Sequence, residues 1–140
     1  MAGTWYLSLS LEQEPFDAGP DEEGRAMVSF NVLALKRPSS ASFVEELIAI
    51  LVDADVGEAG VNIFGSSQVQ IPDASTSGPF LLVRSSQGAP PVGTHNDGKA
   101  AYRRPGAQIL SCARTFAAAD AMAQAAYSAL AAVNNAEVTA

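Results

Sequence analysis

The stretch 104–133 constrains the fold more than any other part of the chain, because it predicts a strand that leads directly into a helix. Residues 107–113 alternate with the period of two that a strand requires. Thr115 is suited to cap a helix, and beyond it apolar residues recur at steps of three and four, with alanine in most other positions. A helix face made mostly of alanine implies close packing on a sheet. The predicted apolar stripe comprises Phe116, Ala119, Met122, Ala123, Ala126, Tyr127, Leu130 and Val133.

Residues 5–11 and 26–36 predict an antiparallel hairpin. Each segment alternates in the way that is typical of a half-buried strand, and this alternation places Tyr6 on the outward face. The connection 14–25 is acidic, but its spacing lacks the alternate ligands of a calcium loop, so a solvated turn is expected. The residues predicted to face the core are Trp5, Leu7, Leu9 and Leu11, and then Val28, Phe30, Val32 and Ala34.

A second helix is predicted after the proline and serines at 38–40. Ser42 followed by Glu45 forms a capping box, which marks the start of this helix. We expect it to end near Asp55 or Gly57. Its predicted apolar face comprises Phe43, Val44, Leu47, Ile48 and Leu51.

The middle of the chain predicts further strands and one long loop. Short segments at 61–64 and 68–71 favour edge strands, and the nearly continuous apolar run 79–85 predicts a strand buried on both faces. Glycine, proline and asparagine are frequent at 86–105, where we expect a loop. The elements together indicate one α+β domain over residues 1–140, with a mainly antiparallel sheet, two helices packed on one face and the long loop between the central strands.

Composition and charge bear on the class of protein. Hydrophobic residues make up 48% of the chain, yet no apolar run is long enough to span a membrane, and we expect no signal peptide because a basic flank is missing. The formal net charge is −7, with 15 acidic and 8 basic residues. This excess of acidic residues argues against a nucleic-acid-binding protein, because contacts with phosphates need clustered cations. The single cysteine excludes an internal disulfide and fits synthesis in a reducing cytoplasm.

Residues 93–99 match the first positions of a phosphate-binding loop, but their surroundings do not fit. Such a loop follows a buried strand and opens a helix, so that backbone amides converge on the phosphates. Here Pro90 and Pro91 precede it and Pro105 follows closely, while Ala100 replaces the hydroxyl that would hold magnesium. We therefore interpret the segment as a flexible glycine-rich loop.

No constellation of residues suggests catalysis. His95 and Cys112 are the only histidine and cysteine, and Cys112 lies in a predicted strand, where it resembles a small buried hydrophobe. The spacing of the acidic residues suggests no metal site. We therefore expect no catalytic residue, no metal, no cofactor and no enzymatic activity. Nucleotide hydrolysis that is abolished by Lys99→Ala would contradict this expectation.

Arginines at strand ends and loop margins are candidates for a subunit interface. Guanidinium groups form subunit salt bridges well, although each arginine taken singly is as readily explained as a solvated surface residue. The candidates are Arg84, Arg103 and Arg104, with Arg114 nearby in the same set. The expected acidic partners in a neighbouring subunit are Asp17, Asp21, Glu22 and Glu23.

Three segments resemble the minor capsid or tail-terminator family of long-tailed bacteriophages. Residues 105–114 are similar to its strand of the form Pro-x-x-Gln-x-x-x-x-x-Arg, which precedes an alanine-rich helix with a Tyr-x-x-Leu stretch, as at Tyr127 and Leu130. Residues 42–47 look like the opening helix of that family, and residues 5–36 look like its closing hairpin. The elements therefore stand in circularly permuted order. Such an order implies that residues 138–140 lie next to Thr4 and Trp5.

The resemblance implies a structural protein of the virion, located at the tail–neck junction and made in the host bacterial cytoplasm. Tail terminators form a ring, expected here to be a homohexamer, which caps the tail tube and joins it to the neck. The implied partners are the tail tube protein and a neck, stopper or head-completion protein, with DNA passing through the lumen without specific binding. Residues 86–104 are expected to reach a neighbouring subunit or the tail tube. The alternatives are a head-completion or stopper protein of the neck and a small ligand-binding or nucleotide-binding domain.

Overall fold

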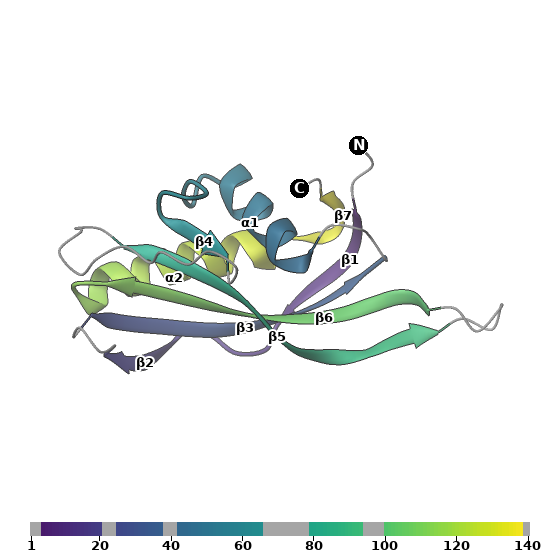
Figure 1. The fold of residues 1–140 in the computed structure, drawn as a ribbon, viewed down its shortest axis with the longest axis horizontal. Helices are drawn as coiled ribbons and strands as arrows, with labels where there is room; N and C mark the ends of the chain where they lie inside the picture. Colours follow the sequence, from purple (N-terminus) through teal and green to yellow (C-terminus); the bar gives the residue numbers. More distant parts are fainter. Residues whose placement is uncertain (1–3, 21–24, 38–41, 66–78, 94–99, 139–140) are drawn as a thin grey trace.

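A seven-stranded sheet with both helices on one face forms the body of the protein (Figure 1). The computed structural model describes residues 4–20, 25–37, 42–65, 79–93 and 100–138. The elements are β1 (Thr4–Leu11), β2 (Phe16–Pro20), β3 (Ala26–Lys36), α1 (Phe43–Asp53), β4 (Ile63–Gly65), β5 (Phe80–Gly93), β6 (Ala100–Ala113), α2 (Phe116–Ala131) and β7 (Asn134–Val138). The strand order is β4-β5-β6-β3-β1-β7, with β2 beside β3. β4 runs parallel to β5, whereas β5–β6, β6–β3, β3–β1, β1–β7 and β2–β3 are antiparallel pairs. This arrangement confirms the predicted α+β class.

The predicted N-terminal hairpin is confirmed, but its acidic connection contains an additional strand. β1 pairs antiparallel with the second part of β3, and β2 pairs antiparallel with the first part. β1 and β2 therefore follow one another along the same side of β3. The predicted inward residues of β3, which are Val28, Phe30, Val32 and Ala34, are all buried.

A bulge in β1 changes which side chains face the helices. Tyr6 pairs with Lys36 and Leu9 pairs with Ala34, so β1 contains one more residue than β3 over this interval. Tyr6 and Leu9 consequently lie on the same face, and both belong to the main core. The prediction that Tyr6 faces outward is wrong, because simple alternation does not register an extra residue.

The α1 helix begins as its capping box predicts. The Oγ atom of Ser42 accepts a hydrogen bond from the backbone N–H of Glu45 over 3.1 Å. At the other end, the N–H of Val56 donates to the carbonyl of Leu51 over 3.0 Å, and Asp55 has a positive φ of 59°. This pattern is a Schellman motif, which ends the helix slightly before the predicted boundary.

The α2 helix packs closely on the sheet through its alanines, as predicted. Ala119, Ala123 and Ala126 are fully buried, and the hydroxyl of Ser111 on β6 donates to the carbonyl of Ala119 over 2.7 Å. Thr115 caps the helix by accepting from the N–H of Ala118. Phe116 departs from the predicted stripe, because it is the first helical residue after the turn from β6 and its side chain is 50% exposed.

The face of the sheet away from the helices carries a second apolar cluster. The rings of Phe64 and Phe80 meet edge to face at 6.2 Å between centroids, and the guanidinium carbon of Arg25 lies 5.0 Å from the centroid of Phe80. Leu81 and Val83, which alternate with Phe80 and Leu82 along β5, face the main core instead. Burial on both faces is thereby confirmed for residues 80–83, whereas Arg84 and Ser85 at the end of the predicted run are exposed. The buried members of the second cluster are Phe64, Phe80, Leu82, Leu110 and Cys112.

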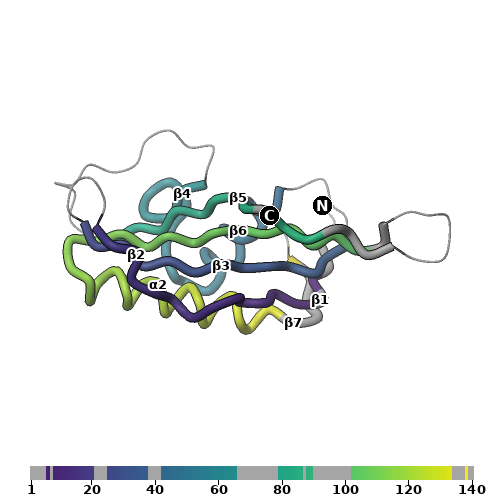
Figure 2. Tube along the Cα trace, turned by 90° about the horizontal axis from the view of Figure 1, so that it is seen from below, coloured from purple at the N-terminus to yellow at the C-terminus, as the bar shows by residue number. Residues whose placement is uncertain are grey.

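The long loop expected at 86–105 is in large part a β-ribbon, so that prediction is wrong. β5 and β6 continue beyond both helices as a paired ribbon, and we call this ribbon, residues 86–93 and 100–105, the arm (Figures 1 and 2). β3 flanks the base of the arm, because Lys36 pairs with Arg103. Its pairing register shifts at three places. Such bulges accommodate glycine and proline in a strand, which is why composition alone suggested a loop.

The two ends of the described chain lie side by side. β7 pairs antiparallel with β1, and Val138 is the register partner of Thr4 (Figure 1). The expected proximity of these residues is confirmed, while residues 139–140 lie outside the described part of the chain. Of the two weak strands, 61–64 corresponds to β4 and 68–71 lies outside the described residues.

Candidate subunit interface

The arm depends on a close approach between its two strands. A Cβ atom built on Gly88 would lie 2.2 Å from the carbonyl oxygen of Arg104 and 2.9 Å from the backbone nitrogen of Gly106. No side chain fits at that separation. Gly88 is therefore required at the first register shift, between Ser86 and Ala89.

Two of the three candidate arginines lie on the arm. Arg103 is exposed and pairs across the sheet with Lys36, and Arg104 is partly buried and pairs with Ala89. Arg84 is exposed but belongs to the body of the sheet, where Gln108 is its register partner. The structure therefore places Arg103 and Arg104 together and separates Arg84 from them.

Asp17, the acidic candidate that the structure describes, lies at the other end of the sheet. Asp17 on β2 is exposed and pairs with Val28, and its Oδ1 atom accepts a hydrogen bond from the N–H of Gly19 over 2.8 Å. Val28 and Lys36 are eight residues apart on β3, about 26 Å along a strand, so Asp17 does not meet Arg103 within one chain. Asp21, Glu22 and Glu23 lie outside the described residues.

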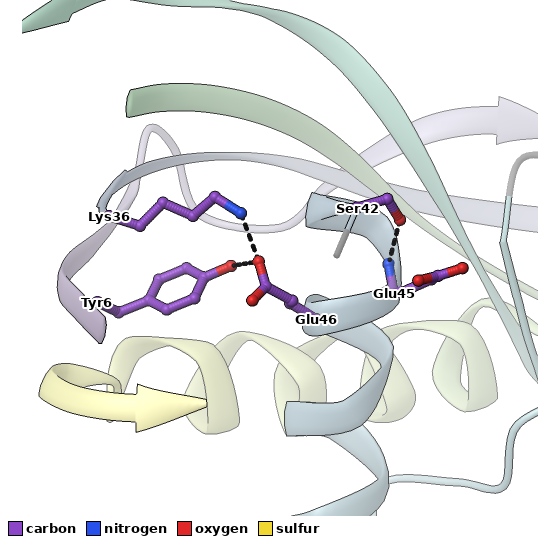
Figure 3. Close-up of polar contacts among 5 residues, drawn as sticks. All are labelled: Tyr6, Lys36, Ser42, Glu45 and Glu46. Carbon is purple, nitrogen blue, oxygen red and sulfur yellow. Dashed lines mark hydrogen bonds and ion pairs between the residues drawn. The ribbon is translucent and has the colours of Figure 1, made fainter. Parts of the chain in front are cut away.

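A buried polar cluster at the base of the arm was not predicted from the sequence (Figure 3). The hydroxyl of Tyr6 donates to Oε1 of Glu46 over 3.0 Å, and the ammonium of Lys36 forms an ion pair with the same oxygen. The exposed fractions of the three residues are 0%, 1% and 4% in the order Tyr6, Glu46 and Lys36. Through Glu46, this cluster connects α1 to β1 and to Lys36, the last residue of β3.

Aromatic rings and mutual charge neutralisation stabilise this cluster. The Nζ atom of Lys36 lies 5.6 Å from the ring centroid of Tyr6 and 5.7 Å from that of Phe43, distances at which a cation is attracted to an aromatic face. Burial raises the pKa of the Tyr6 phenol well above its usual range, and the neighbouring Glu46 carboxylate raises it further through its charge and its hydrogen bond. The phenol therefore acts as a hydrogen-bond donor to Glu46.

The sequence does carry a signal for this cluster. Lys36 continues the even-numbered apolar face of β3, and Glu46 lies on the apolar face of α1 between Phe43 and Leu47. Charged residues that fall on predicted core faces are rarely buried unless they are paired. Two such residues of opposite sign could thus have been predicted to form a pair.

The described residues offer little for catalysis or for a metal ion. No group of three or more His, Cys, Asp and Glu side chains is positioned to hold a metal within the described ranges. Cys112 is buried, and His95 lies outside those ranges. β6 begins at Ala100, so a strand stands where a phosphate-binding loop would require a helix.

Comparisons with protein-family models, with curated proteins and with solved structures give no match. The resemblance to tail terminators therefore rests on the three segments at 5–36, 42–47 and 105–130 alone. Within the described part of the chain, neither α1 nor α2 is long and apolar enough to cross a membrane.

Proposed function

We propose that this chain is a structural protein of a long-tailed bacteriophage virion, a tail terminator whose subunits form a ring that caps the tail tube and joins it to the neck. The single observation that carries the proposal is the arm, which extends beyond the body of the domain (Figures 1 and 2). The motif resemblance supplies the class of assembly, and the adjacency of Thr4 and Val138 is compatible with the permuted order that the resemblance requires.

A projecting two-stranded ribbon is best explained by a partner. An isolated hairpin is marginally stable in water, and ordering its residues costs about 1–2 kcal/mol each in backbone entropy. Contacts with a neighbouring subunit or with the tail tube would offset that cost. The exposed guanidinium of Arg103 suits such a contact, because arginine is enriched at protein interfaces.

The distribution of charge supports head-to-tail assembly. The arm with Arg103 and Arg104 lies at one end of the sheet, and β2 with Asp17 lies at the other. Complementary surfaces at opposite ends of a subunit form a heterologous interface, which closes into a ring when its rotation divides a full turn. We propose six subunits, with Arg84 as a further candidate for such pairs. The net charge of −7 would let DNA pass through the lumen, because an acidic surface repels phosphates.

The oligomeric state of the purified chain tests this proposal. We expect light scattering after size-exclusion chromatography and negative-stain microscopy to reveal a ring of six subunits. In the assembled virion, the ring should lie at the head-proximal end of the tail tube. A ring bound to the head side of the neck would favour the head-completion or stopper alternative, and a monomer at every concentration, also in the presence of tail tubes, would contradict the proposal.

A further inference from the structure

The outward side of α1 carries an apolar groove with acidic residues in its lining. The groove has a volume of about 390 Å³ and is open to the surface. Ile48, Ala49, Val52 and Ala59 line it together with Glu45 and Asp53, the first and last of its lining residues on α1. Ile48 and Val52 also pack against the main core, and with Ala49 they are only partly buried. The described residues therefore leave part of this side of the helix open to a partner.

The charges around the groove are unfavourable in a single subunit. Asp53 and Asp55 lie at the C-terminal end of α1, where the helix dipole is already negative, and the last turn contains no basic residue. Glu58 follows close by and is exposed. Asp55 also occupies a left-handed backbone conformation that glycine would adopt more readily. A cation supplied by a partner would relieve this accumulation of negative charge.

We propose that this groove receives the arm of a second copy of the chain, with Arg103 as the residue that enters it. The proposal rests on the function proposed above, because it identifies the acceptor surface of that ring. Arg103 is exposed at the base of the arm, where it is the register partner of Lys36 on β3. An arginine can lay its methylene groups on an apolar surface while its guanidinium pairs with a nearby carboxylate.

The dimensions agree with this occupant. Glu45 and Asp53 are eight residues apart, which corresponds to about 12 Å along a helix. A strand advances about 3.3 Å per residue, so this length matches roughly four residues of extended chain. The arm has that length available on β6 between Ala100 and Arg104. By contrast, the carboxylate of Asp17, the acidic candidate on β2, already accepts from the N–H of Gly19.

Charge-reversal variants in complementary pairs test the groove. Wild-type assembly is compared with the groove variant Glu45→Lys/Asp53→Lys, the arm variant Arg103→Glu and the matched control Glu12→Lys/Glu14→Lys, which makes the same change of charge at two exposed residues between β1 and β2. We expect the groove and arm variants each to raise the dissociation constant for assembly at least about tenfold, equivalent to about 1.4 kcal/mol. An equimolar mixture of the two should restore assembly to within about threefold of the wild type, because each arm then meets a groove of opposite charge. The control should assemble like the wild type.

The outcomes separate this inference from the proposed function. Suppose that the wild type forms rings and that the groove variant forms them equally well, or that the control alone fails to form them. The arm then binds elsewhere, and the inference is wrong while the function stands. If the wild type forms no ring, both fail. Thermal unfolding of each variant checks that it is folded. The milder variant Glu45→Gln/Asp53→Asn should weaken assembly in the same direction if Lys at these positions destabilises α1.

Discussion

The hydroxyl of Tyr6 on β1 donates a hydrogen bond to Oε1 of Glu46 on α1 over 3.0 Å, and both residues are buried. The bulge in β1 makes this contact possible, because it turns Tyr6 toward the helices. Lys36 on β3 forms an ion pair with the same carboxylate, and its register partner on β6 is Arg103 at the base of the arm. A single carboxylate thus joins the first strand, the third strand and the first helix.

Removing the lysine should leave a buried charge without its counterion. We expect Lys36→Met to lower the free energy of unfolding by about 3–5 kcal/mol, because the Glu46 carboxylate then lacks a cation. The double variant Lys36→Met/Glu46→Leu should recover most of this loss. A residual cost of about 1–2 kcal/mol is expected from the unsatisfied hydroxyl of Tyr6. Urea unfolding measures all three proteins, and a double variant no more stable than the single one would show that the ion pair is not the cause.

The raised pKa of Tyr6 predicts a loss of stability at high pH. An unfolded tyrosine loses its proton near about pH 10, whereas folded Tyr6 keeps it. Above that pH the folded state binds more protons than the unfolded state, so this contribution is complete below about pH 10 and declines as pH rises, by up to about 1.4 kcal/mol per pH unit. Tyr6→Phe lacks the titrating group. The stability advantage of the wild type over Tyr6→Phe should therefore shrink above about pH 10, and parallel pH profiles would contradict the assignment.

Local patterns predicted most of the body of the fold. The capping residues Ser42 and Thr115, the alanine face of α2 and the alternation in β3 each depend on near neighbours in sequence, and the structure confirms them. The bulge in β1 was not predicted, because an extra residue is defined only by the partner strand. The apolar faces of β3 and α1 indicate that Lys36 and Glu46 need partners, whereas the contact between them forms only when these two elements meet.

The arm was mistaken for a loop for a related reason. Glycine and proline usually interrupt strands, and nothing local to 86–105 indicates that bulges absorb them. The candidate arginines were predicted from their positions near strand ends. The structure groups Arg103 with Arg104 on the arm and assigns Arg84 to the sheet body, a distinction that depends on the register of β5 and β6.

The face assignment in β1 can be tested with two neighbouring residues. Leu9 is buried in the main core, where Met122 and Leu130 of α2 also lie, whereas Ser10 is exposed on the other face. We expect Leu9→Asp to lower the free energy of unfolding by about 3 kcal/mol or more, because it buries an unpaired charge. Ser10→Asp should change it by less than about 0.5 kcal/mol. Equal effects of the two substitutions in thermal unfolding would contradict the register.

The end of α1 offers a stabilising substitution. Asp55 has a positive φ and carries a negative charge at the negative end of the helix dipole. Asp55→Gly removes both penalties and should raise the free energy of unfolding by about 1 kcal/mol. Asp55→Ala removes the same charge but keeps a Cβ atom in the left-handed conformation, so its free energy of unfolding should lie about 1 kcal/mol below that of Asp55→Gly. An alanine variant as stable as the glycine variant in thermal unfolding would contradict the Schellman motif.

Gly88 provides a test of the arm that leaves the body of the domain intact. A Cβ atom at this position would lie 2.2 Å from the carbonyl oxygen of Arg104, so Gly88→Ala should push the two strands of the arm apart. Such overpacking costs about 1–3 kcal/mol locally. Amide hydrogen exchange should show faster exchange in the arm, with protection in β3 and α2 unchanged.

The same substitution should also separate folding from assembly. If the arm forms the subunit contact, Gly88→Ala should yield a folded chain with a melting temperature close to that of the wild-type monomer and a much weaker tendency to form rings. Ser86→Ala is the matched control, because Ser86 is exposed on the same strand before the register shift and pairs normally with Gly106. It should assemble as the wild type does. Rings of unchanged stability from Gly88→Ala, together with altered exchange in the arm, would show that the arm does not carry the contact between subunits.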